Sequence, residues 1–335
     1  MVRVPSYGGP TTYEGQFPHM IEARGLTKRY GGKTAVDGLT FTVRPGIVTG
    51  FLGPNGAGKS TTMRMILGLD APTSGTVTVD GKPYREHAKP LQAVGALLEA
   101  RAVHTSRSAY NHLRALAATH GIANSRVDEV IDLVGLQEVA RKRAGGFSLG
   151  MGQRLGIASA LLADPSTLIL DEPVNGLDPE GIRWIRDLLK SLAAEGRTVF
   201  VSSHLMSEMA LTAEHLIVVG RGRLMADTSV ADLIAGASTT VVTVRTPQAA
   251  ELGRALAGPD VTVSSTAADL LEVTGVAAAQ IGEVARDLGL VLHELTPQQA
   301  SLEEAFMDMT RDEVEYHAAA TPAPGTTAPT SRSAA

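Results

Sequence analysis

The chain contains 335 residues, of which 44% are hydrophobic and 19% are charged. This composition is too apolar for a chain that is disordered throughout, and the length is sufficient for about two or three packed domains. The formal net charge of −5 argues against a protein that neutralises many nucleic-acid phosphates. Cysteine is absent, which excludes disulfide scaffolds, thiolate metal sites and cysteine nucleophiles.

Neither end of the sequence has the pattern of a folded or membrane-inserting segment. Residues 1–19 contain several Gly and Pro residues where a signal peptide requires an apolar run, and residues 318–335 are mostly Ala, Thr, Pro and Ser. We expect both ends to be disordered. No uninterrupted apolar run reaches the roughly 18 residues that a membrane span requires, so no span is predicted.

Between residues 20 and 236, short β-branched runs alternate with helical patterns, which favours an α/β fold with a parallel sheet. The clearest predicted strands are Phe41–Val43, Thr167–Leu170 and Thr198–Val201. A helix is predicted over Ile182–Ala194. The segment from about residue 100 to 160 is mainly helical in pattern, with helices expected at 109–119 and 127–134.

Residues 239–310 follow a different order of elements. The pattern predicts strand, helix, strand, strand, helix and strand, which is the split βαβ order of ferredoxin-like α+β domains. The expected segments are 241–244, 249–256, 261–264, 270–273, 277–288 and 290–295, with a last helix over 302–309. We therefore expect a small α+β domain after the α/β domain.

A glycine-rich loop carries the first chemical signal. Residues 53–60 read Gly-Pro-Asn-Gly-Ala-Gly-Lys-Ser after an apolar run, which fits G-x-x-x-x-G-K-[ST] between a strand and a helix. Such a loop turns backbone amides toward phosphate oxygens at a helix N-terminus. The alternative is a glycine turn before an ordinary helix. The predicted nucleotide-binding residues here are Gly53, Asn55, Gly56, Gly58, Lys59, Ser60 and Thr61.

Two adjacent carboxylates end the predicted strand 167–170. Asp171 is expected to face Mg²⁺ together with Ser60, because hard oxygen ligands suit this ion. Glu172 is expected to orient or deprotonate the water that attacks the γ-phosphate. Taken alone, an Asp-Glu-Pro segment is more often a turn with a solvated acid pair.

Residues 147–151 read Phe-Ser-Leu-Gly-Met at the start of a predicted helix. This segment resembles the Leu-Ser-Gly-Gly-Gln signature of ATP-binding cassette (ABC) ATPases, and it is similar to a variant associated with ABC-2 type drug and antibiotic exporters. Ser148 and Gly150 match the signature, whereas Leu149 and Met151 depart from it. The resemblance implies that Ser148 and Gly150 bind the γ-phosphate of ATP held by an opposite subunit.

Four other positions take their expected roles from the same resemblance. Residues 175–178 match the D-loop that crosses the dimer interface, and Asp178 is included among the nucleotide-site residues. His204 matches the switch histidine of the γ-phosphate, and Tyr30 matches the aromatic residue that stacks on the base. The family usually has Gln as a magnesium ligand where this sequence has Glu99, which we expect to contact the metal.

The resemblance implies a P-loop ABC ATPase fold over residues 20–236, with a helical subdomain at about 100–160. It also implies ATP and Mg²⁺ as cofactors, a homodimer, and catalytic roles for Lys59, Glu172 and His204. A separate transmembrane permease is the expected partner, which would place the chain at the cytoplasmic face of the membrane and make it an exporter ATPase. No nucleic-acid partner is expected. The alternative is a soluble ABC ATPase that acts on ribosomes or in nucleic-acid repair.

Overall fold

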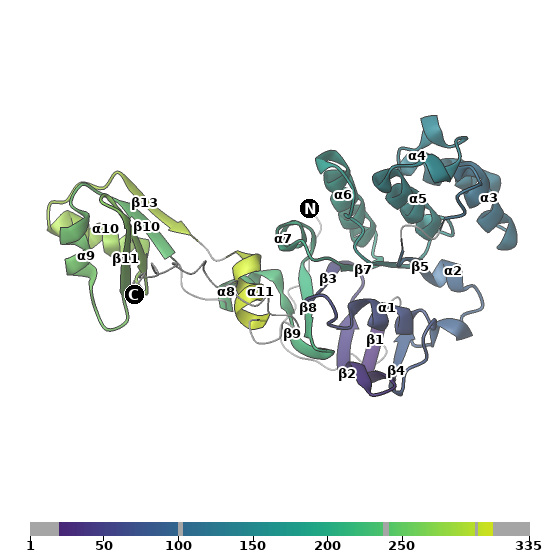
Figure 1. Ribbon diagram of the computed structural model, residues 1–335, viewed down its shortest axis with the longest axis horizontal. Helices are drawn as coiled ribbons and strands as arrows, with labels where there is room; N and C mark the ends of the chain where they lie inside the picture. The colour runs from purple at the N-terminus through teal and green to yellow at the C-terminus, as the bar shows by residue number, and fades with distance from the viewer. Residues whose placement is uncertain (1–19, 100–102, 237–240, 299–300, 311–335) are drawn as a thin grey trace, which may run out of the picture.

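The structure is a computed structural model that describes residues 20–99, 103–236, 241–298 and 301–310. The two ends expected to be disordered lie outside the described residues. Figure 1 shows two bodies, which we name the large domain (residues 20–236) and the small domain (residues 241–298).

A six-stranded sheet in the order β5-β6-β7-β3-β8-β9 forms the centre of the large domain. Its first five strands are parallel, and β9 pairs with β8 in the antiparallel direction. Because β3 lies between β7 and β8, its carboxyl end is surrounded by the ends of neighbouring strands. The bounds are β3 (Val48–Leu52), β5 (Val94–Leu97), β6 (Thr167–Leu170), β7 (Thr198–Ser202), β8 (His215–Gly220) and β9 (Arg223–Ser229).

The central strands are continuous apolar runs because both faces of the sheet are covered. Along β6, Leu168 and Leu170 belong to one core, whereas Ile169 belongs to the other. The same alternation occurs along β7, where Phe200 packs against Phe51 with ring centroids 5.0 Å apart. Successive side chains of a strand point to opposite faces, so each strand contributes to both cores.

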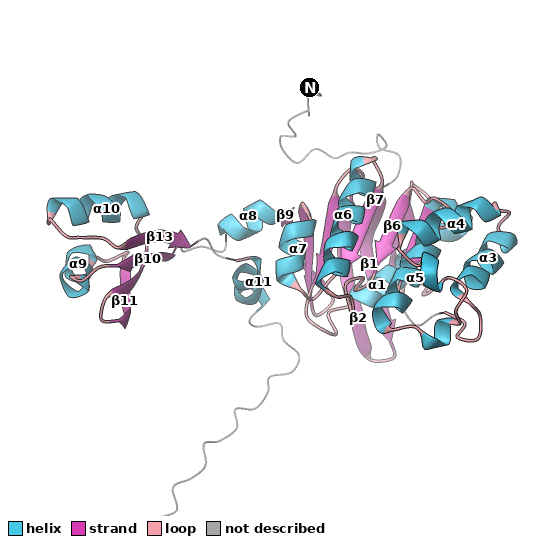
Figure 2. Cartoon of the chain, turned by 90° about the horizontal axis from the view of Figure 1, so that it is seen from above, coloured by secondary structure: helices cyan, strands magenta, loops and turns pink. Residues whose placement is uncertain are grey.

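One face of the central sheet is covered by a second, antiparallel sheet with the order β2-β1-β4 and by two helices. Figure 2 shows the strands of both sheets beside α1. The tight turn before β2 and the paired register from Ile21 to Val43 make β1 and β2 a long hairpin. The bounds are β1 (Ile21–Tyr30), β2 (Lys33–Val43), β4 (Ser74–Val79), α1 (Lys59–Ile66) and α2 (Pro90–Ala93).

Helices cover the other face, and three of them form the helical region of the large domain (Figure 1). Helix α6 has 16 residues, and no helix in the described ranges is both long and apolar enough to cross a lipid bilayer. The bounds are α3 (Ala109–Thr119), α4 (Asn124–Leu133), α5 (Leu149–Leu161), α6 (Pro179–Ala194), α7 (Met206–Thr212) and α8 (Val230–Gly236).

The small domain has an antiparallel sheet in the order β11-β12-β10-β13, and two helices share one core with it. The last strand lies at residues 294–298, later than the predicted 290–295. Leu290 and Leu292 pack against the core before the strand begins, and Pro297 is tolerated because β13 is an edge strand. The bounds are β10 (Val241–Arg245), α9 (Ala249–Leu256), β11 (Thr262–Ala267), β12 (Leu270–Thr274), α10 (Ala278–Asp287) and β13 (Glu294–Gln298).

The final helix, α11 (Leu302–Thr310), packs on the large domain. The sequence pattern predicts this helix as part of the small α+β domain, within residues 239–310. Instead, the buried residues Leu302, Ala305 and Phe306 join the core that also contains Met209 of α7 and Leu233 of α8. An isolated amphipathic helix of this length is only marginally stable, so packing its apolar face on an existing core stabilises it. The small domain is therefore anchored to the large domain on both sides, by α8 and by α11.

We predict that Leu302→Ala lowers the stability of the large domain by about 2 to 5 kcal/mol, because it deletes a side chain that is 2% exposed. The matched control is Met307→Ala on the same helix, where the side chain is 63% exposed. Urea unfolding followed by fluorescence of Trp184, the single tryptophan, measures the difference. Equal stability of the two variants would show that α11 contributes nothing to this core.

Candidate active site

The loop between β3 and α1 has a backbone that only glycine accommodates at key points. Gly56 and Gly58 have φ angles of 82° and 98°, in the left-handed region. A Cβ atom on Gly53 would lie 2.3 Å from the carbonyl oxygen of Val219, and one on Gly58 would lie 2.5 Å from the carbonyl oxygen of Ala35. Helix α1 starts at Lys59 without a side-chain cap, so its first amides are open to an anion.

Lys59 is 8% exposed and folds back over this loop. Its Nζ donates hydrogen bonds to the carbonyl oxygens of Gly53 at 2.7 Å and Pro54 at 3.3 Å. Burial lowers the pKa of the Lys59 ammonium, while the carboxylates of Glu172 and Asp171 act in the opposite direction. A buried ammonium whose charge is only partly compensated is strongly stabilised by a bound phosphate.

Asp171 follows β6 and is held between two hydroxyl groups. Ser60 Oγ donates to its Oδ2 at 2.6 Å, and Ser202 Oγ, at the end of β7, donates to its Oδ1. Ser60 and Asp171 thus offer adjacent hard oxygens beside the loop. Mg²⁺ is typically held by one or two such side chains together with substrate phosphates, so this donor set fits the ion. Among the described residues, no group of three or more His, Asp or Glu side chains is arranged to hold a metal by itself.

Glu172 has a φ angle of 50°, which is uncommon for a residue other than glycine. Its backbone N–H donates to Ser202 Oγ at 3.0 Å, and its carbonyl oxygen accepts from Gln153 Nε2 at 3.1 Å. Its carboxylate oxygen Oε2 lies 2.6 Å from His204 Nδ1. These contacts hold a sparsely populated backbone conformation that aims the carboxylate at the histidine.

Two further predicted residues lie near the rim of this site. Tyr30, the last residue of β1, is 49% exposed, and its hydroxyl donates to Asp70 Oδ2 at 2.9 Å. Desolvation and this hydrogen bond raise the pKa of Tyr30. Glu99 is exposed two residues after β5, at the same sheet edge as Asp171, whose backbone N–H donates to Leu97. Asn55 and Gly56 are exposed in the loop, and Thr61 is half-buried in α1.

Comparison with known proteins places this geometry in a family. Residues 36–175 match the family described as ABC transporter, and residues 240–303 match a domain of unknown function, DUF8746. The bacitracin transport ATP-binding protein BcrA of Bacillus licheniformis is 45% identical over 209 residues, which cover 62% of this chain and 68% of that protein. An uncharacterized ABC transporter ATP-binding protein of Bacillus subtilis strain 168, YdbJ, is 36% identical over 297 residues, covering 87% of this chain and 95% of the relative. The chain belongs to the ATP-binding proteins of ABC transporters.

Solved structures agree with this family. The ABC transporter protein cbiO1 from Clostridium perfringens is 28% identical with a TM-score of 0.58, covering 65% of this chain and 92% of that one. A bacterial ABC transporter cassette solved as a dimer is 25% identical with a TM-score of 0.58, covering 63% and 98%. The predicted fold class is confirmed: the chain is an ABC ATPase, and ATP is its nucleotide.

Residues 147–151, which resemble the family signature, lie at the start of α5. Ser148 is the N-cap residue, and its Oγ accepts a hydrogen bond from the backbone N–H of Met151 at 3.2 Å. A Cβ atom on Gly150 would lie 2.8 Å from the carbonyl oxygen of Gly176 in the D-loop. Asp178 caps α6 by accepting from the N–H of Gly181 at 2.8 Å. Ser148 and Asp178 therefore use their side chains to cap helices, whereas Lys59, Ser60, Asp171, Glu172 and His204 gather at the sheet edge.

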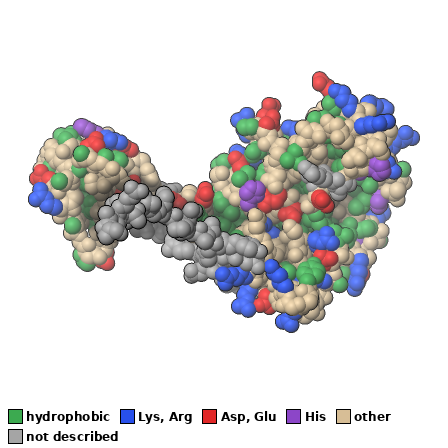
Figure 3. Space-filling model, in the orientation of Figure 1, with side chains coloured by type: hydrophobic (Ala, Val, Ile, Leu, Met, Phe, Trp, Pro, Cys, Tyr) green, Lys and Arg blue, Asp and Glu red, His purple; other side chains and the backbone are tan. Residues whose placement is uncertain are grey.

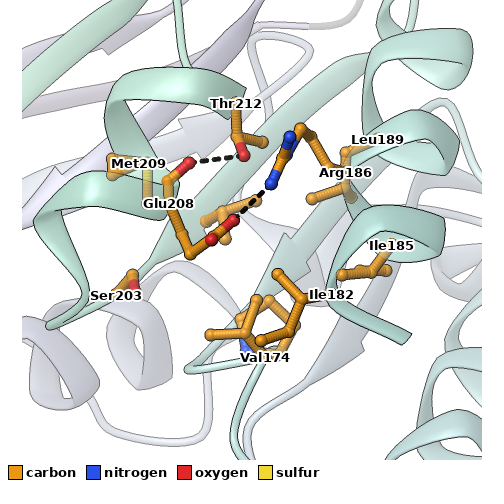
Figure 4. Close-up of a pocket in the computed structure, with 11 residues that line it drawn as sticks. Val174, Ile182, Ile185, Arg186, Leu189, Ser203, Glu208, Met209 and Thr212 are labelled. Atoms are coloured by element: carbon orange, nitrogen blue, oxygen red, sulfur yellow. Dashed lines mark hydrogen bonds and ion pairs between the residues drawn. The ribbon is translucent and has the colours of Figure 1, made fainter. Parts of the chain in front are cut away.

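Figure 4 shows the side chains of Arg186 and Glu208, which join α6 to α7. Arg186 of α6 and Glu208 of α7 form an ion pair with an N–O distance of 2.7 Å. Val174, which follows the Glu172 segment, and Ser203, which precedes His204, line the same small pocket. The segments that follow Glu172 and precede His204 therefore both border this pocket.

Two residues that hold Glu172 in place were not predicted from the sequence. Ser202 bonds both Asp171 and the Glu172 backbone, and Gln153, which is 2% exposed, bonds the Glu172 carbonyl. The position of Ser202 at the end of a predicted strand beside the Asp171 strand was an available signal, because adjacent parallel strands end at one edge. Nothing in the local sequence distinguishes Gln153 from a solvated helix residue.

We predict that Gly58→Ala lowers ATP affinity by about tenfold or more, equivalent to roughly 1.4 kcal/mol. The new methyl group meets the Ala35 carbonyl, and the positive φ angle adds strain. Gly32→Ala is the control, because that glycine has open space around it and no positive φ angle. Titration with a fluorescent ATP analogue measures both affinities. Full ATP affinity in Gly58→Ala would contradict the claim that the loop has no room for a side chain at position 58.

Proposed function

We propose that two copies of this ABC ATPase enclose two Mg-ATP molecules between them. In each site, one copy supplies Tyr30 and the loop 53–61, and the other supplies Ser148 and Gly150. The observation that supports this proposal is the grouping of side chains within one chain. Ser60 donates to Asp171, and Ser202 bonds both Asp171 and the Glu172 backbone, beside the buried Lys59. The side chain of Ser148 instead caps α5, and Gly150 lies close to Gly176 of the predicted D-loop. The dimeric cassette among the related structures supports it.

Within each site, we assign Mg²⁺ to Ser60 and Asp171, with Glu99 as a third ligand. When bound, this ion neutralises charge on the β- and γ-phosphates. Lys59 adds a buried positive charge on the same phosphates. Ser202 keeps Asp171 in place, because its hydroxyl occupies the carboxylate oxygen that Ser60 does not use.

Glu172 is assigned to orient the attacking water and accept its proton. His204 contacts the γ-phosphate, and the bond from its Nδ1 to Glu172 fixes the direction of the ring. Loss of the γ-phosphate removes the contacts at Ser148 and His204, so hydrolysis releases the two copies. ATP binding thereby shifts the pair toward the closed arrangement, and hydrolysis reverses that shift.

We further propose that the chain powers export of an antibiotic-like molecule through a separate transmembrane subunit, at the cytoplasmic face of the membrane. The similarity to a bacitracin transport ATP-binding protein supports this assignment. The alternative, a soluble ABC ATPase that acts on ribosomes or nucleic-acid repair, is disfavoured by the net charge of −5. The face drawn in Figure 3 carries acidic as well as basic side chains, which also argues against a continuous nucleic-acid surface.

We predict that Glu172→Gln reduces ATP turnover by about 100-fold or more, because the amide cannot accept the proton from water. Nucleotide binding is retained, so the variant accumulates as a dimer with Mg-ATP. Size-exclusion chromatography with light scattering measures its mass, and the double variant with Lys59→Ala serves as the monomeric control. A monomer at saturating Mg-ATP would contradict the proposed dimer.

We predict that Glu99→Gln keeps ATP affinity within about threefold of the unmodified chain, because the amide oxygen remains a hard ligand. The same titration on Lys59→Ala provides the comparison, since that change removes a buried charge from the phosphates. A loss of affinity in Glu99→Gln as large as that in Lys59→Ala would contradict the metal-side role of Glu99.

A further inference from the structure

Leu149 stands where the family signature has its first glycine, and the structure reveals what its side chain touches. It is the first residue of α5, directly after Ser148, and it is 49% exposed. A Cβ atom built on Gly176 would lie 2.4 Å from Leu149 Cγ and 2.4 Å from its Cδ2. The leucine therefore packs directly over Gly176, which turns with a φ angle of 76°. The contact joins the signature segment to the D-loop of the same chain.

The D-loop is also hydrogen-bonded to Glu172, the residue assigned to orient the attacking water. The backbone N–H of Asn175 donates to the carbonyl oxygen of Glu172 at 3.2 Å. That carbonyl also accepts from Gln153 Nε2, which belongs to α5. Helix α5 thus reaches Glu172 by two routes, one through Gln153 and one through Leu149 and the D-loop turn.

We propose that Leu149 is a positioning residue that couples the two ATP sites. This inference rests on the proposed dimer, in which Ser148 of one chain binds the ATP held by the other. Leu149 makes Ser148 and the turn after Glu172 move as one unit. When Ser148 binds the ATP held by the partner, the Leu149–Gly176 contact positions Glu172 in the ATP site of its own chain. The first glycine of the usual signature has no side chain with which to make this contact.

The test measures ATP hydrolysis against ATP concentration for the full chain and three variants. We expect Leu149→Ala to lower kcat roughly tenfold, as a small misplacement of a reacting group does, and to reduce the Hill coefficient toward 1. The affinity of the single chain for ATP stays unchanged. Leu149→Met refills the space and retains most of kcat. Leu133→Ala, which shortens a helical leucine that is 42% exposed, is the control and changes neither quantity.

A double-mutant cycle tests the contact itself. Gly176→Ala introduces a methyl group against Leu149 and also strains a positive φ angle, so it lowers kcat in the unmodified chain. We expect its effect to be smaller in the Leu149→Ala background, because the two closest atoms, Cγ and Cδ2 of Leu149, are removed and only Cβ remains near the new methyl group. Additive effects of the two changes would overturn the proposal.

The other outcomes separate this inference from the proposed function. A Leu149→Ala chain with unchanged kcat and Hill coefficient, or with higher activity, overturns the positioning role while the dimer of Glu172→Gln still forms. An unmodified chain that dimerises but hydrolyses ATP with a Hill coefficient of 1 also overturns the coupling. Failure of Glu172→Gln to dimerise on Mg-ATP would instead remove the proposed function on which the coupling rests.

Discussion

The hydrogen bonds that Asp171 accepts from Ser60 and Ser202 are the interaction on which the rest of the site depends. They tie together the start of α1 and the ends of β6 and β7, which are far apart in the sequence. The parallel order β6-β7-β3 makes this possible, because all three strands end at one edge. The glycine loop, the buried Lys59 and the Glu172–His204 pair lie around that junction, so the residues assigned to the phosphates, the metal and the attacking water are close together.

Packing on both faces of the central sheet fixes the register of the strands that end at this edge. Apolar side chains alternate between two cores along β6, β7 and β8, so a shift of one strand by one residue would disturb both. Helix α11, which follows the small domain in the sequence, extends one of these cores. The helix also packs beside α7, which follows His204, so the small domain is anchored close to an element of the active site.

Much of the grouping at the sheet edge could be predicted from the sequence. The loop motif identifies residues 53–60, and the position of Asp171 and Glu172 at the end of a strand after that loop favours a functional role over a solvated turn. The resemblance adds Ser148 and His204. The missing parts depend on contacts between distant segments. The strand end at Ser202 indicates only that this residue lies at the same edge as Asp171, and its bond to Glu172 requires the structure. The role of Gln153 is defined only by its contact with Glu172. Leu149 is a departure from the signature in the sequence, and the structure adds its contact with Gly176. In the same way, α11 was assigned to its sequence neighbours because periodicity identifies an apolar face but not the surface that the face covers.

The central claim is that each ATP site is built from two chains, and a complementation assay tests it most directly. Lys59→Ala damages the loop but leaves the signature, whereas Ser148→Ala damages the signature but leaves the loop. Each variant alone has two defective sites, but a mixed dimer has one site with both parts intact. The account predicts that mixing the two inactive proteins restores ATP hydrolysis above the sum of their separate rates. No recovery in a mixture shown to form mixed dimers would contradict it.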